Sequence, residues 1–321
     1  MTASVVALDA SREDGGGSPP LLRVTRLSKA FPGVQALSAV DFDLRAGEVH
    51  CLIGENGAGK STLVKILAGV QPADTGAIAV AGRAVSFADP LEAQEAGIAC
   101  IFQELNVVGG LTVAENIMLG AESGRFGFVD RRANEARARE ILDGVGFAEL
   151  DVRRPCAELS PAEKQAVMIA KALRQNARVI IMDEPSSPLE ELEVRRLYAV
   201  IARLKAAGCG IIYVSHKMRE IAELGDRITV FKDGARVATL ARGEADSGEL
   251  VRLMVGRQLN EMFPQRDRSF GDVVLAVENL TGAAVRDVSF TLRSGEILGI
   301  AGLVGAGRTE LLRTIFGRAE R

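Results

Sequence analysis

The feature of this sequence that most constrains its fold is the run GENGAGKST at residues 54–62. The apolar run VHCLIG at 49–54 leads into it and an amphipathic segment follows, which predicts a strand before the run and a helix after it. The pattern G-x-x-x-x-G-K-[ST] in this context is typical of a phosphate-binding loop. Further runs at 179–184, 211–215 and 228–232 are apolar on both faces, which predicts a parallel sheet covered by helices and hence an α/β protein.

The nine residues of the loop are the predicted contacts of a bound nucleotide: Gly54, Glu55, Asn56, Gly57, Ala58, Gly59, Lys60, Ser61 and Thr62. Gly57 and Gly59 permit backbone conformations and close approaches that a Cβ would prevent, so that N–H groups point at the phosphates. Lys60 is placed to bind the β- and γ-phosphates, and Ser61 to hold Mg²⁺. The predicted ligand is therefore a nucleoside triphosphate with its magnesium ion.

Polar side chains follow other predicted strands. Asp183 and Glu184 end the run VIIMDE, His216 follows IIYVS, and Gln103 follows IACIF. Nucleotide sites form at the strand ends of open parallel sheets. Asp183 is expected to hold Mg²⁺ through water, and Glu184 to orient and polarise an attacking water. Gln103 is expected to reach the same ion and water, although Gln103 and His216, taken singly, suit ordinary surface or core positions equally well.

The loop recurs in altered form as GLVGAGRTE at 302–310, with Arg308 in place of the lysine. The segments around the two loops align over a Leu-Arg strand, a Gly-Glu turn, an apolar strand (VHCLIG and ILGIAG), the loop and a helix, which indicates a duplicated domain. We expect a fragment or truncated product of a two-domain protein. The predicted layout is a disordered tail at 1–20, a first domain at 21–242, a linker at 243–271 and the start of a second domain at 272–321.

Between the loop and the Asp-Glu pair lies LSPAEKQAVMIAKAL, which is similar to the signature motif of the ATP-binding subunits of ABC transporters. The chain past residue 20 resembles that family. The resemblance implies a P-loop NTPase with a RecA-like parallel sheet core, an antiparallel β subdomain and a helical subdomain, followed by a partial second copy. It makes Phe31 the aromatic that stacks on adenine and Ser160 the signature serine. It also makes Gln103 the Q-loop glutamine, Glu184 the catalytic carboxylate and His216 the switch histidine.

Four runs are more similar to the tandem subunits of monosaccharide importers: FPGVQAL at 31–37, AENIMLG at 114–120, SHKMREI at 215–221 and MVGRQLNEMFP at 254–264. This resemblance implies an ATPase that works as a translocase subunit, bound peripherally to permease subunits on the cytoplasmic side of the membrane. An external sugar-binding protein would be an indirect partner, and a second nucleotide-binding domain or another copy of this chain a direct one. Pro161 removes one N–H from the signature loop, so ATP binding is better supported than turnover.

Charge, hydropathy and cysteine spacing limit the other functions that the chain could have. A net charge of −3 does not suit a nucleic-acid binder, and no run of about 18 apolar residues predicts a membrane span. The four cysteines lack metal or redox spacing and predict reduced thiols. Two rivals remain, a soluble ABC ATPase that acts on ribosomes or DNA and a truncated product that binds nucleotide with little ATPase activity. The transported substrate, a sugar or a nucleoside, is set by other proteins.

Overall fold

The computed structural model describes residues 19–102, 106–125, 128–174, 177–187, 189–255, 270–282, 285–302 and 305–318. Gln103 lies outside these ranges, as do most of the predicted tail and most of the run at 254–264. The chain divides near residue 260 into two compact units, and each is described by itself.

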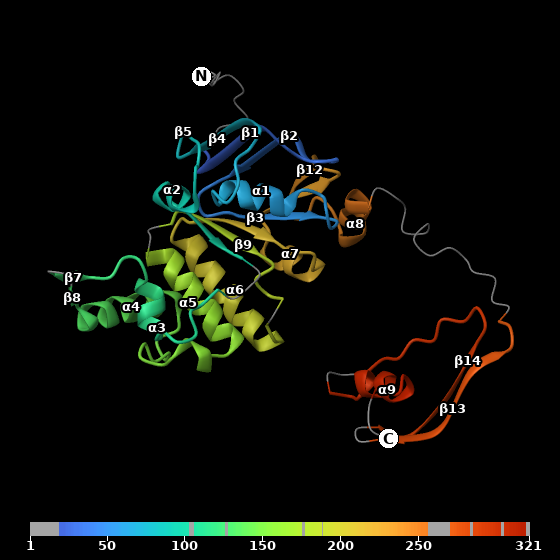
Figure 1. The fold of residues 1–321 in the computed structure, drawn as a ribbon. Helices are drawn as coiled ribbons and strands as arrows, with labels where there is room; N and C mark the ends of the chain where they lie inside the picture. The colour runs from blue at the N-terminus through green and yellow to red at the C-terminus, as the bar shows by residue number, and fades with distance from the viewer. Residues whose placement is uncertain are drawn as a thin grey trace. The chain divides into compact units, whose positions relative to one another are not determined.

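The first unit is centred on a six-stranded sheet with the order β12-β11-β3-β10-β9-β6 (Figure 1). Its strands are β3 (Val49–Gly54), β6 (Ile98–Ile101), β9 (Val179–Asp183), β10 (Gly210–Val214), β11 (Arg227–Lys232) and β12 (Ala235–Ala241). All neighbouring pairs are parallel except the hairpin of β11 and β12. β3 and β10 are buried along their whole length, as strands covered on both faces should be. The prediction of a parallel sheet is confirmed.

A smaller antiparallel sheet and two helices cover one face of the main sheet (Figure 1). The smaller sheet has the order β2-β1-β4-β5. Its strands are β1 (Leu22–Phe31), β2 (Val34–Leu44), β4 (Thr75–Val80) and β5 (Arg83–Val85), and the helices are α1 (Lys60–Leu67) and α2 (Pro90–Glu95). Leu52, Ile181 and Ile212 of the main sheet share a buried core with these elements. This packing holds α1, and the loop before it, between the two sheets.

Helices cover the opposite face, where Cys51, Ile180 and Tyr213 of the main sheet form a second core with them. They are α3 (Val113–Met118), α4 (Arg131–Val145), α5 (Pro161–Arg174), α6 (Glu191–Ala206), α7 (Met218–Leu224) and α8 (Ser247–Val255). A short strand pair, β7 (Gly124–Arg125) and β8 (Phe128–Val129), precedes α4. α8 falls in the predicted linker, yet its Leu250 and Met254 belong to this core. Among the described residues, no helix combines the length and apolarity needed to cross a membrane.

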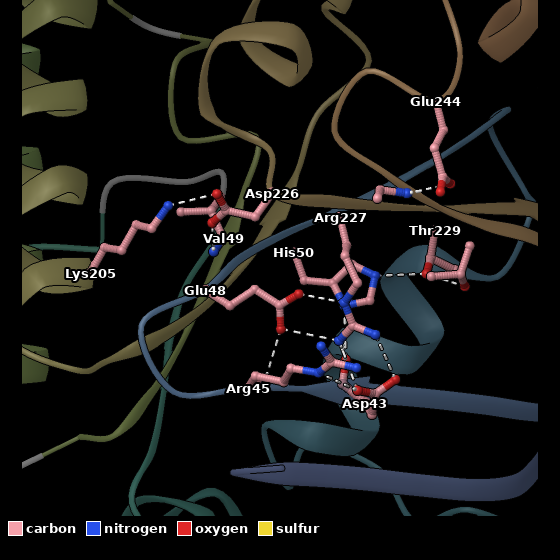
Figure 2. A network of polar contacts seen from close by, with 12 residues as sticks. Asp43, Arg45, Glu48, Val49, His50, Lys205, Asp226, Arg227, Thr229 and Glu244 are labelled. Carbon is pink, nitrogen blue, oxygen red and sulfur yellow. Dashed lines mark hydrogen bonds and ion pairs between the residues drawn. The ribbon is translucent and has the colours of Figure 1, made fainter. Parts of the chain in front are cut away.

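Arg227 on β11 joins the two sheets through a polar network (Figure 2). Its guanidinium pairs with Asp43 on β2, with 2.7 Å between Nη2 and Oδ2, and with Glu48 just before β3. His50 on β3 is 1% exposed, and its ring nitrogens lie 2.8 Å from the Asp43 carbonyl oxygen and 2.7 Å from Thr229 Oγ1. The network therefore fixes the strand that leads into the glycine-rich loop.

Acid is expected to destabilise the first unit through His50. Burial, together with the positive charge of Arg227, lowers the pKa of His50 from 6.5 to about 4. Between these two pH values the unfolded chain binds more protons than the folded chain, so stability falls as pH drops through this window. The shift corresponds to a loss of about 3 kcal/mol that is complete below about pH 4.

Urea unfolding followed by circular dichroism at several pH values measures this loss, since the chain contains no Trp. His50→Gln should flatten the dependence of stability on pH between 6.5 and about 4. The same measurement on His216→Gln, which replaces the other histidine of the chain, an exposed one, is the control for the substitution itself. An equally steep acid limb in His50→Gln would show that other groups control it.

The second unit contains two strands and a helix within its described residues: β13 (Val273–Gly282), β14 (Val285–Arg293) and α9 (Arg308–Ile315). β13 and β14 pair antiparallel. The run ILGIAG at 297–302, predicted as a strand by its alignment with β3, is not a strand, and its Ile297 is 75% exposed. An interior strand needs neighbours to bond its backbone groups, and the described part of this unit has no strands besides β13 and β14. The strand prediction is therefore wrong here.

Candidate functional site

Two glycines fix the shape of the loop at 54–62. Gly54 has a φ of 155° and Gly59 a φ of 98°, both unusual for residues with a side chain. A Cβ on Gly54 would lie 2.3 Å from the Phe231 carbonyl oxygen, and one on Gly59 would lie 2.4 Å from the Ala36 carbonyl oxygen. Any larger residue would have to displace the backbone of β11 or β2. The loop is therefore held closely against both sheets.

The tip of the loop is open to solvent and leads into an uncapped helix. Glu55, Asn56 and Gly57 are exposed, and the backbone of α1 begins without a side-chain cap. The first N–H groups of a helix have no partner within it, and here they belong to the turn that includes Ser61 and Thr62. Such an N-terminus next to a glycine-rich loop suits phosphate groups.

Lys60 is the first residue of α1 and is 9% exposed. Its Nζ donates to the Gly54 carbonyl oxygen at 2.7 Å and to the Glu55 carbonyl oxygen at 2.9 Å, so the side chain folds back over the loop. Burial lowers the pKa of Lys60, and the negative charges of Glu184 and Asp183 partly oppose this. The ammonium group therefore lies within electrostatic reach of both carboxylates.

Asp183 ends β9, two strands away from β3 in the main sheet. Burial raises its pKa, as does the charge of Glu184, while Lys60 and Lys65 act in the opposite direction. A half-buried carboxylate beside another carboxylate favours a nearby cation, because the cation relieves both penalties. Asp183 thus has the surroundings expected of a residue that faces a metal ion.

Glu184 follows in a left-handed backbone conformation, with a φ of 47° that a residue with a side chain rarely adopts. Its N–H donates to the Val214 carbonyl oxygen at 2.9 Å, which ties it to the end of β10. Nδ1 of His216, just beyond β10, donates to Glu184 Oε1 at 2.9 Å. The structure therefore brings together Lys60, Glu184 and His216 at the carboxyl edge of the sheet.

Phe31 ends β1, where it pairs with Val34 across the turn of a hairpin. Its side chain is 43% exposed, and the Lys29 ammonium lies 5.8 Å from the ring centroid. The following strand, β2, contains Ala36, which lies against the loop glycine Gly59. An exposed aromatic ring on a hairpin that borders the loop is available for stacking.

Ser160 immediately precedes α5, in the helical layer of the unit. Its N–H donates to Glu163 Oε2 at 2.7 Å, and the Glu163 N–H donates to Ser160 Oγ at 3.3 Å. Arg154 binds both carboxylate oxygens of Glu163, at 2.9 and 2.7 Å. Within the described residues these bonds connect Ser160 to its own helix and not to the phosphate loop. The structure therefore does not place Ser160 beside Lys60, Glu184 and His216.

Ser61 and Asp183 are the predicted magnesium ligands that can be placed. Among the described residues, no three His, Cys, Asp or Glu side chains gather into a metal site. One hydroxyl and one carboxylate nevertheless suit Mg²⁺, which usually keeps several waters and takes phosphate oxygens as further ligands. The donors therefore fit an ion that arrives with a nucleotide. Gln103, the third predicted ligand, lies outside the described residues.

Residues 37–187, which include the loop and the Asp-Glu pair, match the family model described as "ABC transporter". The chain contains an ABC transporter domain.

Two solved structures share its fold. The ADP conformation of MJ1267, an ATP-binding cassette, has a TM-score of 0.65, is 26% identical, and covers 75% of this chain and 100% of its own. An ATP-binding subunit of an ABC transporter has a TM-score of 0.60, is 28% identical, and covers 73% of this chain and 99% of its own. The predicted P-loop NTPase class is confirmed for the ABC domain.

Curated relatives match well beyond the ABC domain. "Ribose import ATP-binding protein RbsA 1" of Rubrobacter xylanophilus is 53% identical over 93% of this chain. "Putative ribose/galactose/methyl galactoside import ATP-binding protein 1" of Burkholderia lata is 52% identical over 94% of it. The chain spans 60% and 59% of the length of these two relatives. The predicted resemblance to importer subunits is confirmed.

Sequence reasoning missed one polar group of the first unit that adjoins the Glu184–His216 pair. Glu220, on α7, is 4% exposed and accepts hydrogen bonds from three hydroxyl groups around this pair. Within the run SHKMREI, His216 was the one residue predicted to belong to the site. A carboxylate four residues after a histidine at a strand end is the signal that could have singled Glu220 out.

Proposed function

We propose that this chain binds MgATP at the loop 54–62 and hydrolyses it, as the ATP-binding subunit that powers import of a monosaccharide. The observation that carries the proposal is the meeting of Lys60, Asp183 and the Glu184–His216 pair beside this loop. A glycine-rich loop with a buried lysine, next to two carboxylates at the end of a parallel strand, is the arrangement that phosphoryl transfer from a nucleotide requires.

Each residue has a distinct role in this proposal. Lys60 leaves its two carbonyl partners and binds the β- and γ-phosphates, while the N–H groups of the loop bind the remaining phosphate oxygens. Ser61 and Asp183 hold Mg²⁺, Asp183 through water, and the ion when bound neutralises phosphate charge. Glu184 polarises the attacking water, and His216 holds the carboxylate of Glu184 in place.

The resemblance to ABC transporter subunits assigns roles in ATP binding and hydrolysis to three further residues. Phe31 stacks on the adenine ring, and Gln103 reaches the magnesium ion and the attacking water. Ser160 contacts the ATP of a second nucleotide-binding domain, which another chain or a further domain supplies. The loop around Arg308 resembles a second nucleotide loop of reduced catalytic capacity.

The transport role is inferred from the names of the relatives, which describe ribose, galactose or methyl galactoside import. Separately encoded permease subunits in the membrane are the direct partners, and a sugar-binding protein outside the cytoplasm is an indirect one. The subunit acts peripherally on the cytoplasmic side of the membrane. No nucleic acid takes part, in keeping with the net charge of −3.

ATP hydrolysis by the purified chain should rise steeply with protein concentration. The 321 residues hold one Asp-Glu pair after a P-loop and one signature-like segment, both in the first unit. If ATP is sandwiched between the loop of one domain and the signature serine of another, two first units from separate chains must pair. An ATPase assay over a wide range of protein concentration tests this. A rate per chain that stays constant on dilution would show that a single chain is competent.

A further inference from the structure

We propose that Glu220 is a positioning residue that holds Glu184 and His216 in their productive arrangement. The inference rests on the proposed ATPase function and adds a residue to which that function assigns no role. The hydrogen-bond and ion-pair partners of the Glu220 carboxylate are Ser186, Tyr213, Ser215 and Lys217, and not Glu184 or His216. Glu220 acts through the two backbone segments that carry Glu184 and His216.

Three hydroxyl groups from two segments converge on the carboxylate of Glu220. Ser186 Oγ donates to Oε1 at 2.5 Å, while Tyr213 OH and Ser215 Oγ donate to Oε2 at 2.8 and 2.9 Å. The Lys217 ammonium lies 3.3 Å from Oε1 and also donates to Ser186 Oγ at 3.0 Å. Both oxygens of the carboxylate thus accept hydrogen bonds from hydroxyl groups.

Two of the donors lie next to the catalytic pair in the sequence. Ser186 lies two residues after Glu184, and Ser215 lies immediately before His216. One buried carboxylate therefore fixes the distance between the segment after β9 and the segment after β10. The Nδ1–Oε1 distance of 2.9 Å between His216 and Glu184 depends on that spacing.

Glu184 needs external support because its backbone is in the left-handed region, with a φ of 47°. Such a conformation persists only where the surroundings hold it. Ser187, in the same turn, donates its N–H to the Glu184 carbonyl oxygen at 3.1 Å. Ser186 anchors the middle of this turn to Glu220, which prevents the turn from relaxing.

The donors around Glu220 stabilise its ionised form. Burial raises the pKa of Glu220, but the hydrogen bonds from Ser186, Tyr213 and Ser215 and the charge of Lys217 outweigh this, so the pKa lies below its usual value. The group is therefore a carboxylate that only accepts hydrogen bonds. Its amide analogue would turn one acceptor into a donor that faces other donors.

Single-turnover hydrolysis of MgATP by the full chain tests the role of Glu220. In Glu220→Gln the affinity for MgATP should be unchanged, because the phosphate loop is untouched, while the hydrolysis rate should fall about 10- to 100-fold. Glu115→Gln is the matched control, since Glu115 is a half-buried carboxylate that accepts hydrogen bonds from the N–H and the hydroxyl of Thr112 at the start of α3, in the helical layer. It should keep the wild-type rate.

A second comparison separates positioning from general loosening of the fold. If Glu220 acts through Glu184, the double variant Glu184→Gln/Glu220→Gln should be no slower than Glu184→Gln alone. Ser186→Ala breaks only the link to the Glu184 segment and should reduce the rate even if Glu220→Gln does not fold.

Wild-type rates in both Glu220→Gln and Ser186→Ala would overturn the inference. So would equal losses in Glu220→Gln and Glu115→Gln, or additive losses in the double variant. A wild-type chain that does not bind MgATP at any concentration would instead overturn the proposed function, and this inference with it.

Discussion

Lys60→Ala is expected to weaken binding of MgATP about 100-fold or more. In the proposed complex the ammonium group makes two charge-assisted hydrogen bonds to the β- and γ-phosphates, each of which contributes about 1.5–3 kcal/mol. Lys60 is 9% exposed and its ammonium group lies against the loop carbonyls, so water cannot readily replace it. The N–H groups of the loop remain, which is why residual weak binding is expected.

Titration with a fluorescent ATP analogue in the presence of Mg²⁺ measures this effect. Lys65→Ala is the matched control, because Lys65 is an exposed lysine on the same helix, α1. It should change the affinity little, since exposed charges interact weakly through water. Circular dichroism should show that both variants keep the fold. An unchanged affinity in Lys60→Ala would mean that the nucleotide binds elsewhere.

Glu184→Gln is expected to slow ATP hydrolysis about 100-fold or more while ATP still binds. The amide has nearly the same shape as the carboxylate but lacks the charge that polarises the attacking water. Loss of one negative charge near Lys60 also removes a repulsion toward the phosphates, so the affinity for MgATP should be equal or higher.

Hydrolysis under single-turnover conditions, together with the binding titration, separates the two effects. Glu191→Gln is a suitable control, because it removes a carboxylate whose side chain is 86% exposed at the start of α6. It should hydrolyse ATP at the wild-type rate. Full turnover in Glu184→Gln would assign the role of base to another group.

Local patterns were sufficient to predict the loop and the strands that surround the candidate site. The spacing of Gly54, Gly59 and Lys60 gave the loop because each glycine occupies a backbone conformation that side chains disfavour. The apolar run before Asp183 predicted β9 because a strand buried on both faces must be apolar throughout. Glu184 and His216, which follow two neighbouring strands of the main sheet, lie in contact.

Features that depend on distant partners could not be predicted in the same way. Arg227 meets Asp43 across 184 positions of the sequence, and neither residue lies in a recognisable pattern. Glu220 lacks a motif of its own, because its role comes from hydroxyl groups that the fold assembles around it. The run ILGIAG has the apolarity of a strand, yet a strand forms only where neighbouring strands can bond it.

A crystal structure of the Glu184→Gln chain with MgATP tests the central claim most directly. The account predicts that the phosphates lie over the loop at 54–62. Lys60 Nζ should be within hydrogen-bond distance of the β- and γ-phosphate oxygens and should have left the carbonyl oxygens of Gly54 and Glu55. A nucleotide bound elsewhere, with Lys60 still bonded to these two carbonyl oxygens, would contradict the account.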